Sequence, residues 1–343
     1  MAAASKPRTI DVHTHWFPES WPDFGKRFGG TDWPSIRHNG KGEADICLGE
    51  QPFRKIDARC WDAQRRLEQM DRDGVDVQLI SPTPVMFGYQ RPAQHALEAC
   101  KFLNDALLEF CGRGNGRFLP LCQVPLQEPA AAARELERCV KAGHVGVEIG
   151  NHVGLKNLDD LGILDFLAQC ARVGAAVFVH PWDMMACERM PEYMMPWTVA
   201  MPAETQLAIT ALIESGGFDR LPKELRILFA HGGGSFAFLL GRLENAWRHS
   251  PVARGKSELA PSEYVKRFFV DSAVFEPKAL EFLVSVMSEE RVCLGSDFPY
   301  PLGEERAGQL IRESRFSDDV RAKLLGGNAQ QWLNLKVSQP AHG

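Results

Sequence analysis

The sequence lacks long apolar runs, clustered basic residues and an apolar segment ahead of its first predicted strand. A membrane-spanning helix needs about 18 or more consecutive apolar residues, so no such helix is expected. The first residues do not resemble a secretory signal. Lys and Arg are scattered and the net charge is −5, which argues against a nucleic acid or a membrane surface as partner. We therefore predict a cytoplasmic protein that acts on a small molecule.

Paired cysteines are also missing. The nine cysteines are widely spaced, odd in number, and none lies in a C-x-x-C pair. Most fall in apolar segments, as Cys122 and Cys293 do. These features predict reduced, buried side chains that act as small hydrophobic groups, and they disfavour both a disulfide framework and thiolate metal ligands.

What the sequence does contain is an alternation of short apolar runs with stretches of helical period. The runs predicted to form strands cover 8–15, 76–82, 118–124, 144–150, 175–181, 226–232, 268–274 and 291–297. Several helical stretches end at a glycine, as at Gly74, Gly143 and Gly174. No glycine-rich phosphate turn follows the first run, which disfavours an open doubly wound sheet. The sequence therefore predicts an α/β fold, a (β/α)₈ TIM barrel that forms a single domain over residues 1–343.

Two connections are too long for ordinary barrel loops. Residues 16–60, between the first two strands, are rich in Gly, Trp and Pro, and predict a small lid-like insertion with a possible hairpin near 40–50. Residues 183–200 are rich in Met and aromatic residues. This segment is either a core-packing methionine cluster or a hydrophobic wall over the pocket. The tail after Leu335 is expected to be frayed.

Chemistry-bearing side chains gather at the predicted carboxyl ends of the strands. His13 and His15 are two residues apart on the first strand, so their side chains face the same way. His180, His231 and Asp297 end the fifth, sixth and eighth strands. Active sites of TIM barrels lie at this end of the barrel, so we expect the five side chains to converge there.

The donor types suggest a division of roles. His13, His15, His180 and Asp297 form a set of three nitrogens and one oxygen, which suits zinc and accepts other divalent first-row metals. His231 is then left as a nearby general base for a water acidified by the metal. In the alternative, His231 binds a second metal, which would need a bridging group on the fourth strand. That strand has no Lys, and Glu148 is its only acidic candidate, with a side-chain direction that the pattern does not fix. We therefore favour one metal.

Some polar residues have open roles at this stage. Arg54 in the insertion and Arg242 after the sixth strand are suited to bind carboxylates, although both can also be ordinary surface arginines. His152 either lines the mouth of the barrel or has a structural role. Asp271 is expected to make a structural hydrogen bond.

Longer motifs indicate a family. The chain resembles the aminocarboxymuconate-semialdehyde decarboxylase family, in the decarboxylase branch of the amidohydrolase superfamily, over nearly its whole length. The segments that carry the resemblance include GNHVG (150–154), HPWDMM (180–185), MPAETQLAI (201–209), HGGGSFAFLLGR (231–242) and LGSDFPYPLGE (294–304). Departures from the family pattern at Tyr193, Phe298 and Tyr300 are expected to retune the pocket without changing the reaction.

The resemblance implies a complete reaction. One zinc per chain would be held by His13, His15, His180 and Asp297, and His231 would activate the metal-bound water that adds to the substrate before CO₂ leaves. The substrate would be 2-amino-3-carboxymuconate 6-semialdehyde, from tryptophan (kynurenine) or nitroaromatic catabolism. Arg54 and Arg242 would grip its carboxylates, with Arg242 donated across a homodimer interface. The alternatives are a decarboxylase of a hydroxylated aromatic acid on the same metal site, a lactone or amide hydrolase, and a barrel without catalysis.

Overall fold

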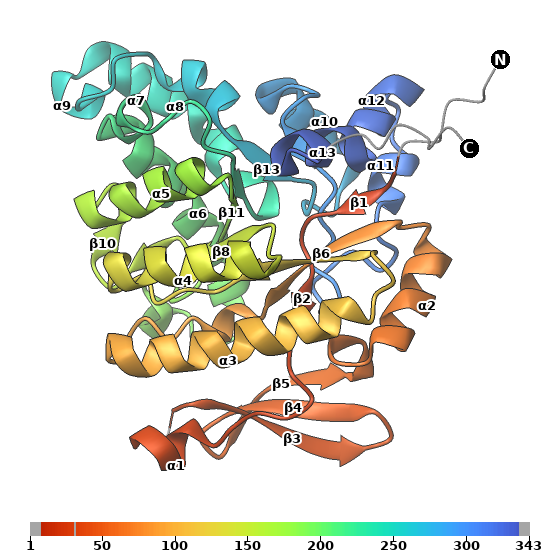
Figure 1. Cartoon of the computed structure of the whole chain (residues 1–343). Coiled ribbons are helices and arrows are strands. Elements are labelled where there is room, and N and C mark those ends of the chain that lie inside the picture. The colour runs from red at the N-terminus through yellow and green to blue at the C-terminus, as the bar shows by residue number, and fades with distance from the viewer. Residues whose placement is uncertain (1–7, 31, 336–343) are drawn as a thin grey trace.

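The computed structural model describes residues 8–30 and 32–335. The tail after Leu335, predicted to be frayed, lies outside the described residues. Parallel strands form a closed barrel (Figure 1). In spatial order they are β1 (Ile10–Asp11) with its continuation β2 (His15–Trp16), β6 (Val77–Pro82), β7 (Phe118–Cys122), β8 (Gly146–Gly150), β11 (Ala176–His180), β12 (Ile227–Phe229), β13 (Phe269–Asp271) and β14 (Val292–Cys293).

The barrel closes between its first and last strands. The Val12 N–H donates to the Leu294 carbonyl oxygen at 2.9 Å, and Thr14 forms a parallel bridge with Phe298. Each of the eight predicted strands is present, although several are shorter than predicted. The predicted TIM barrel is confirmed.

Helices surround the barrel, as Figure 1 shows. The longer ones are α2 (Ala63–Asp73), α3 (Ala93–Gly112), α4 (Pro129–Ala142), α5 (Leu161–Val173), α6 (Met201–Glu214), α8 (Phe236–His249) and α10 (Pro277–Met287). Short helices are α1 (Phe24–Phe28), α7 (Gly217–Arg220), α9 (Pro251–Arg254), α11 (Gln309–Arg312), α12 (Asp318–Ala322) and α13 (Asn328–Leu333). The predicted glycine C-caps are confirmed, and Gly74 and Gly174 adopt the left-handed conformation that a glycine tolerates without strain. None of the described helices is long and apolar enough to span a bilayer.

The core has two layers. Inside the barrel, Leu79, Phe178 and Leu228 pack with Trp332 from α13. Between the barrel and the helices lies a larger layer that includes Leu136, Ile149, Phe166, Phe229 and Leu280. Eight of the nine cysteines are free and buried, as predicted, whereas Cys187 is free and exposed.

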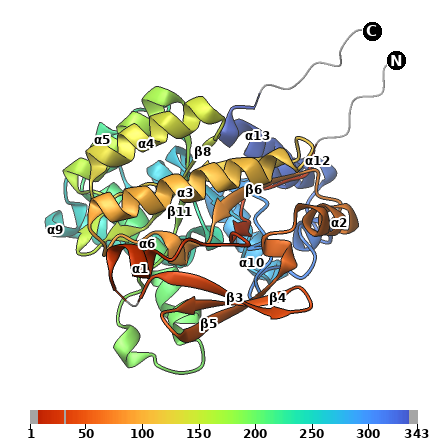
Figure 2. The ribbon, with the colours of Figure 1, turned by 60° about the horizontal axis from the view of Figure 1, so that its bottom comes forward.

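The insertion is a three-stranded antiparallel sheet of β3 (Pro34–Gly40), β4 (Glu43–Leu48) and β5 (Gln51–Asp57), one strand more than the predicted hairpin. Figure 2 shows this sheet in front of the barrel, with the light-green segment that follows β11 beside β5. A second small hairpin, β9 (His152–Val153) with β10 (Lys156–Asn157), follows β8. The lid function of residues 16–60 stays a prediction.

The segment 183–200 is not a core-packing cluster. Met185, Met194 and Val199 are exposed, and Tyr193 is 84% exposed. The interpretation that placed these side chains in the core is therefore wrong for them, and the alternative of a hydrophobic wall over the pocket stays a prediction.

Candidate metal centre and active site

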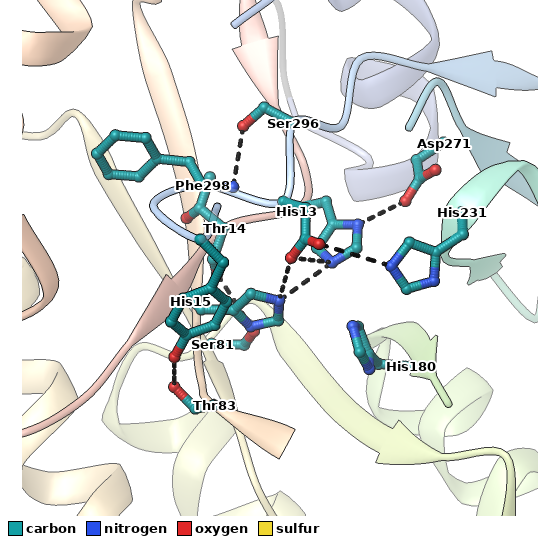
Figure 3. A network of polar contacts seen from close by, with 12 residues as sticks. His13, Thr14, His15, Ser81, Thr83, His180, His231, Asp271, Ser296 and Phe298 are labelled. Carbon is teal, nitrogen blue, oxygen red and sulfur yellow. Dashed lines mark hydrogen bonds and ion pairs between the residues drawn. The ribbon is translucent and has the colours of Figure 1, made fainter. Parts of the chain in front are cut away.

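The first strand brings two imidazoles to one point. His13 lies between β1 and β2, and His15 begins β2. Their Nε2 atoms are 3.1 Å apart, and Figure 3 shows both rings turned toward the same space. The alternation of side chains along a strand explains this placement, as the sequence predicted.

The other three predicted side chains meet the two imidazoles there. His180 ends β11, His231 follows β12, and Asp297 lies in the loop after β14. The carboxylate of Asp297 is 3.0 Å from His15 Nε2, 3.5 Å from His13 Nε2 and 3.8 Å from His231 Nε2. The His180 ring centroid is 5.0 or 5.1 Å from those of His13, His15 and His231. Ligand atoms of His13, His180, His231 and Asp297 all lie within 4.8 Å of one another.

The loops that carry His231 and Asp297 adopt unusual backbone conformations. Both residues have left-handed φ angles, 56° and 60°. Each costs roughly 1–3 kcal/mol and persists only where surrounding contacts fix it, which is common at functional sites. Nearby, a Cβ on Gly295 would come within 2.9 Å of His13 Cβ and 2.6 Å of Asp271 Cβ, so only glycine fits there.

Hydrogen bonds at the back of the rings turn the opposite nitrogens toward the centre. His13 Nδ1 lies 2.7 Å from Asp271 Oδ2, and His180 Nδ1 lies 2.9 Å from the Pro181 carbonyl oxygen (Figure 3 labels both rings). Each Nδ1–H donates outward, so Nε2 is the nitrogen of each ring that faces the cluster. This is the usual arrangement of histidine metal ligands. Together with one carboxylate, this donor set fits a divalent first-row cation.

Burial and charge set the protonation of the cluster. Burial lowers the pKa of His13, but the hydrogen bond and charge of Asp271 outweigh it and raise that pKa to about 9. Burial lowers the pKa of His15 to about 4 and that of His180 well below its ordinary value. Burial alone would raise the pKa of Asp297, but hydrogen bonds to His15 and His231 hold it well below its ordinary value. The cluster therefore offers two neutral imidazoles and a carboxylate at neutral pH.

Two buried carboxylates support the cluster: Asp271 makes the structural hydrogen bond that the sequence predicted, whereas the sequence did not single out Asp11. Asp271 accepts from His13 and, through Oδ1, from the Gly232 N–H at 2.9 Å. Asp11 accepts from the Ser296 hydroxyl at 2.5 Å and from the Ser296 N–H at 3.1 Å, next to Asp297. Both aspartates interrupt apolar strand sequences, and this interruption is the sequence feature that indicates a buried, hydrogen-bonded carboxylate.

Glu148 and His152 are not part of the cluster. Glu148 is buried in the barrel, where it accepts from the Ser81 hydroxyl at 3.0 Å and the Gln123 amide at 3.4 Å. His152 has its ring nitrogens 2.8 Å from the Gly154 carbonyl oxygen and 3.0 Å from that of Asp183. Neither supplies the bridging ligand that a second metal would need.

The two predicted arginines have different surroundings. The guanidinium of Arg54, on β5, lies 4.4 Å from the centre of the Tyr300 ring, and that ring stacks on His15 at 5.2 Å. Arg54 thus lies one ring away from the cluster. Arg242 is exposed on α8, and it has no ion-pair partner in the part of the chain that the structure describes.

Comparison with known proteins agrees with this geometry. The amidohydrolase family model matches residues 10–335. The 2-amino-3-carboxymuconate-6-semialdehyde decarboxylase of Dictyostelium discoideum is 43% identical over 329 residues, which cover 95% of this chain and 91% of that protein.

Solved structures share the fold. The 5-carboxyvanillate decarboxylase of Sphingomonas paucimobilis is 25% identical, with a TM-score of 0.82 over 96% of this chain and 100% of its own. A dihydroxybenzoic acid decarboxylase from Polaromonas, solved with bound manganese, is 22% identical, with a TM-score of 0.76 over 96% of this chain and 97% of its own. From the matched family, the aligned relative and the converged cluster, we conclude that this chain belongs to the amidohydrolase family, in its aminocarboxymuconate-semialdehyde decarboxylase branch.

Proposed function

We propose that this chain is a zinc-dependent carboxy-lyase that converts 2-amino-3-carboxymuconate 6-semialdehyde to 2-aminomuconate 6-semialdehyde and CO₂. The observation that carries the proposal is the convergence of three buried histidines and Asp297 beside His231, with Arg54 one aromatic ring away. The Dictyostelium relative supplies the substrate class. The proposal includes a cytoplasmic location and a place in tryptophan or nitroaromatic catabolism.

His13, His15, His180 and Asp297 would hold one zinc ion. Their Nε2 atoms and carboxylate face one another, while the hydrogen bonds of His13 and His180 to Asp271 and Pro181 fix the two rings from behind. When bound, zinc acidifies a water molecule and stabilises negative charge on a neighbouring oxygen. Manganese and other first-row divalent ions suit the same donors.

His231 is assigned as the general base. Its side chain is 14% exposed, compared with 0% for His13 and 1% for His15, so it is the histidine of this trio that substrate can reach. Its Nε2 lies 3.8 Å from Asp297 Oδ2, the longest of the histidine contacts to that carboxylate. In this role Nε2 takes up a proton from water, the hydroxide adds to the substrate double bond, and Nε2 passes the proton to the neighbouring carbon that bears the departing carboxylate. When the C–C bond to CO₂ breaks, its electron pair re-forms the double bond and the added hydroxide leaves.

Two arginines would bind the carboxylates of the substrate. Arg54 already lies beside the cluster, and its planar fork suits bidentate contact with a carboxylate. Arg242 would enter the site of a partner subunit in a homodimer. Phe238, one helical turn away on α8, is 80% exposed and lies 6.2 Å from the Phe282 ring, so an exposed apolar patch adjoins Arg242.

The second candidate is decarboxylation of a hydroxylated aromatic acid, which the two structural relatives favour. The deciding experiment measures kcat/KM for the semialdehyde and for 2,6-dihydroxybenzoate, by CO₂ release from zinc-loaded protein. We expect the semialdehyde to be preferred by orders of magnitude. Preference for the benzoate would retain the metal site and replace the substrate.

A further inference from the structure

A buried polar cluster joins three of the segments that carry the family resemblance: 150–154, 180–185 and 201–209. The proposed function gives this cluster no role. Glu204, buried on α6, belongs to the segment 201–209. Its Oε2 accepts from the Asn151 side-chain amide at 2.7 Å, and its Oε1 accepts from the Met185 N–H at 2.7 Å. Glu204 therefore joins the segment after β8 to the segment after β11.

Asn151 and His152 add two more bonds to the same turn. The side-chain oxygen of Asn151 accepts from the Trp182 N–H at 3.0 Å. His152 Nε2 lies 3.0 Å from the Asp183 carbonyl oxygen and 4.0 Å from Glu204 Oε2. The backbone of residues 182, 183 and 185 is thus held at three successive points by side chains from other elements.

The turn needs such anchors. Asp183 and Ala186 have left-handed φ angles of 57° and 53°, which residues with a Cβ adopt only where contacts fix them. The chain beyond the turn is largely exposed and buries little apolar surface. Side-chain hydrogen bonds therefore have to supply the positioning that a hydrophobic core supplies elsewhere.

Trp182, inside this turn, contacts the strand that carries Arg54. The Trp182 ring lies edge-on to Phe53, with centroids 5.9 Å apart, and Phe53 precedes Arg54 on β5. Figure 2 shows the same two segments side by side. A shift of the turn would therefore move Trp182 against the strand that carries the predicted carboxylate-binding residue.

We propose that Glu204, with Asn151 as its partner, is a positioning residue for substrate binding: it fixes the 182–185 turn so that Trp182 and β5 form the wall next to Arg54. The proposal rests on the proposed function for the identity of the substrate. It assigns Glu204 no contact with metal or substrate.

An exchange of the two side-chain types tests the pairing. In Glu204→Gln, two amide groups face each other, and in Asn151→Asp, two carboxylates do. In the double variant, the Gln amide donates to the Asp carboxylate, the other Asp oxygen accepts from Trp182, and the Gln oxygen accepts from Met185. The double variant restores every hydrogen bond and the original net charge. Asn151→Ala is a milder single variant that removes the bridge without opposing like groups.

The readouts separate positioning from stability. We expect each single variant to raise KM for the semialdehyde by about tenfold or more, with kcat and zinc content near wild type. Amide hydrogen exchange at Trp182 and Met185 should accelerate by about tenfold in the single variants. Both KM and exchange should return toward wild type in the double variant.

Glu135→Gln is the matched control, because Glu135 is a buried carboxylate on α4 that accepts from an asparagine, Asn104, at 2.8 Å, on the outer layer of the barrel. It should leave KM and the exchange at 182 and 185 unchanged. The proposal is overturned if the single variants keep the wild-type KM and exchange rates, or if the double variant is no better than they are. Failure of the substrate assignment is seen separately, as inactivity of the wild type, and leaves the exchange test intact.

Discussion

The Nδ1–H of His13 donates to Asp271 Oδ2 across 2.7 Å, inside the barrel and out of contact with solvent. The same carboxylate accepts from the Gly232 N–H, directly after His231. One side chain on β13 thus orients a ligand of the proposed metal and supports the left-handed turn that carries the proposed base. This relationship explains why an acidic residue occupies an otherwise apolar strand.

This contact predicts a pH dependence of metal binding. The hydrogen bond and charge of Asp271 outweigh burial and raise the pKa of His13 to about 9, so a metal ion entering at neutral pH displaces a proton from His13. Zinc affinity should therefore rise about tenfold per pH unit between pH 6 and 9 and level off above. Calorimetry in buffers of different ionisation enthalpy should find about one proton released per chain at pH 7. In Asp271→Asn, the pH above which zinc affinity stops rising should be lower than in the wild type. A pH-independent zinc affinity in the wild type would contradict the assignment.

Substitutions should separate ligands from base. His180→Ala removes a proposed ligand, so purified protein should contain much less zinc than one ion per chain. His231→Ala should keep its zinc while kcat falls by roughly 10²–10⁴-fold. Metal analysis alongside kinetics checks both. Loss of zinc from the His231 variant would instead make that residue a ligand, in keeping with its place within 4.8 Å of the other donors.

Mixed dimers test the donation of Arg242. Arg54→Ala and Arg242→Ala should each be nearly inactive alone. If Arg242 enters the partner's site, a mixed dimer of the two variants has one site with both arginines, so an equal mixture should recover about a quarter of wild-type activity. Recovery should require dissociation and reassociation of the subunits. No recovery after verified exchange would place Arg242 in its own site or outside any site.

Tyr300 is predicted to act through its ring. The ring lies between Arg54 and His15, and the hydroxyl bonds to Thr83. Tyr300→Phe keeps the ring and should change KM by less than about threefold. Tyr300→Ala removes the surface on which the Arg54 guanidinium rests and should raise KM markedly. Steady-state kinetics of both variants, at equal zinc content, distinguishes the ring from the hydroxyl.

Sequence reasoning predicted the barrel and the converging side chains because both follow from local pattern. Alternation along a strand places His13 and His15 on one side, and parallel strands bring their carboxyl ends to one edge. The supporting contacts do not follow from local pattern. The hydrogen bond from His13 to Asp271 spans 258 residues, and only closure of the barrel brings β1 near β13.

The insertion and the segment 183–200 show a second limit. The sequence indicated a hairpin, but the third strand, β5, pairs through a register shift between Ile46 and Cys47 that turn residues do not reveal. Tyr193 and Met194 are exposed, and the turn at 182–185 that precedes them is hydrogen-bonded to Asn151 and Glu204, which are distant in sequence. Motif composition identified these segments without showing that they touch.

The most direct test of the central claim is CO₂ release from enzymatically generated 2-amino-3-carboxymuconate 6-semialdehyde. It compares zinc-loaded protein, chelated protein, chelated protein given zinc again, and zinc-loaded His231→Ala. We predict release with the loaded protein, none above the spontaneous background after chelation, recovery with zinc, and loss in the variant. Absence of release from wild-type protein that holds one zinc per chain would contradict the assignment of this substrate.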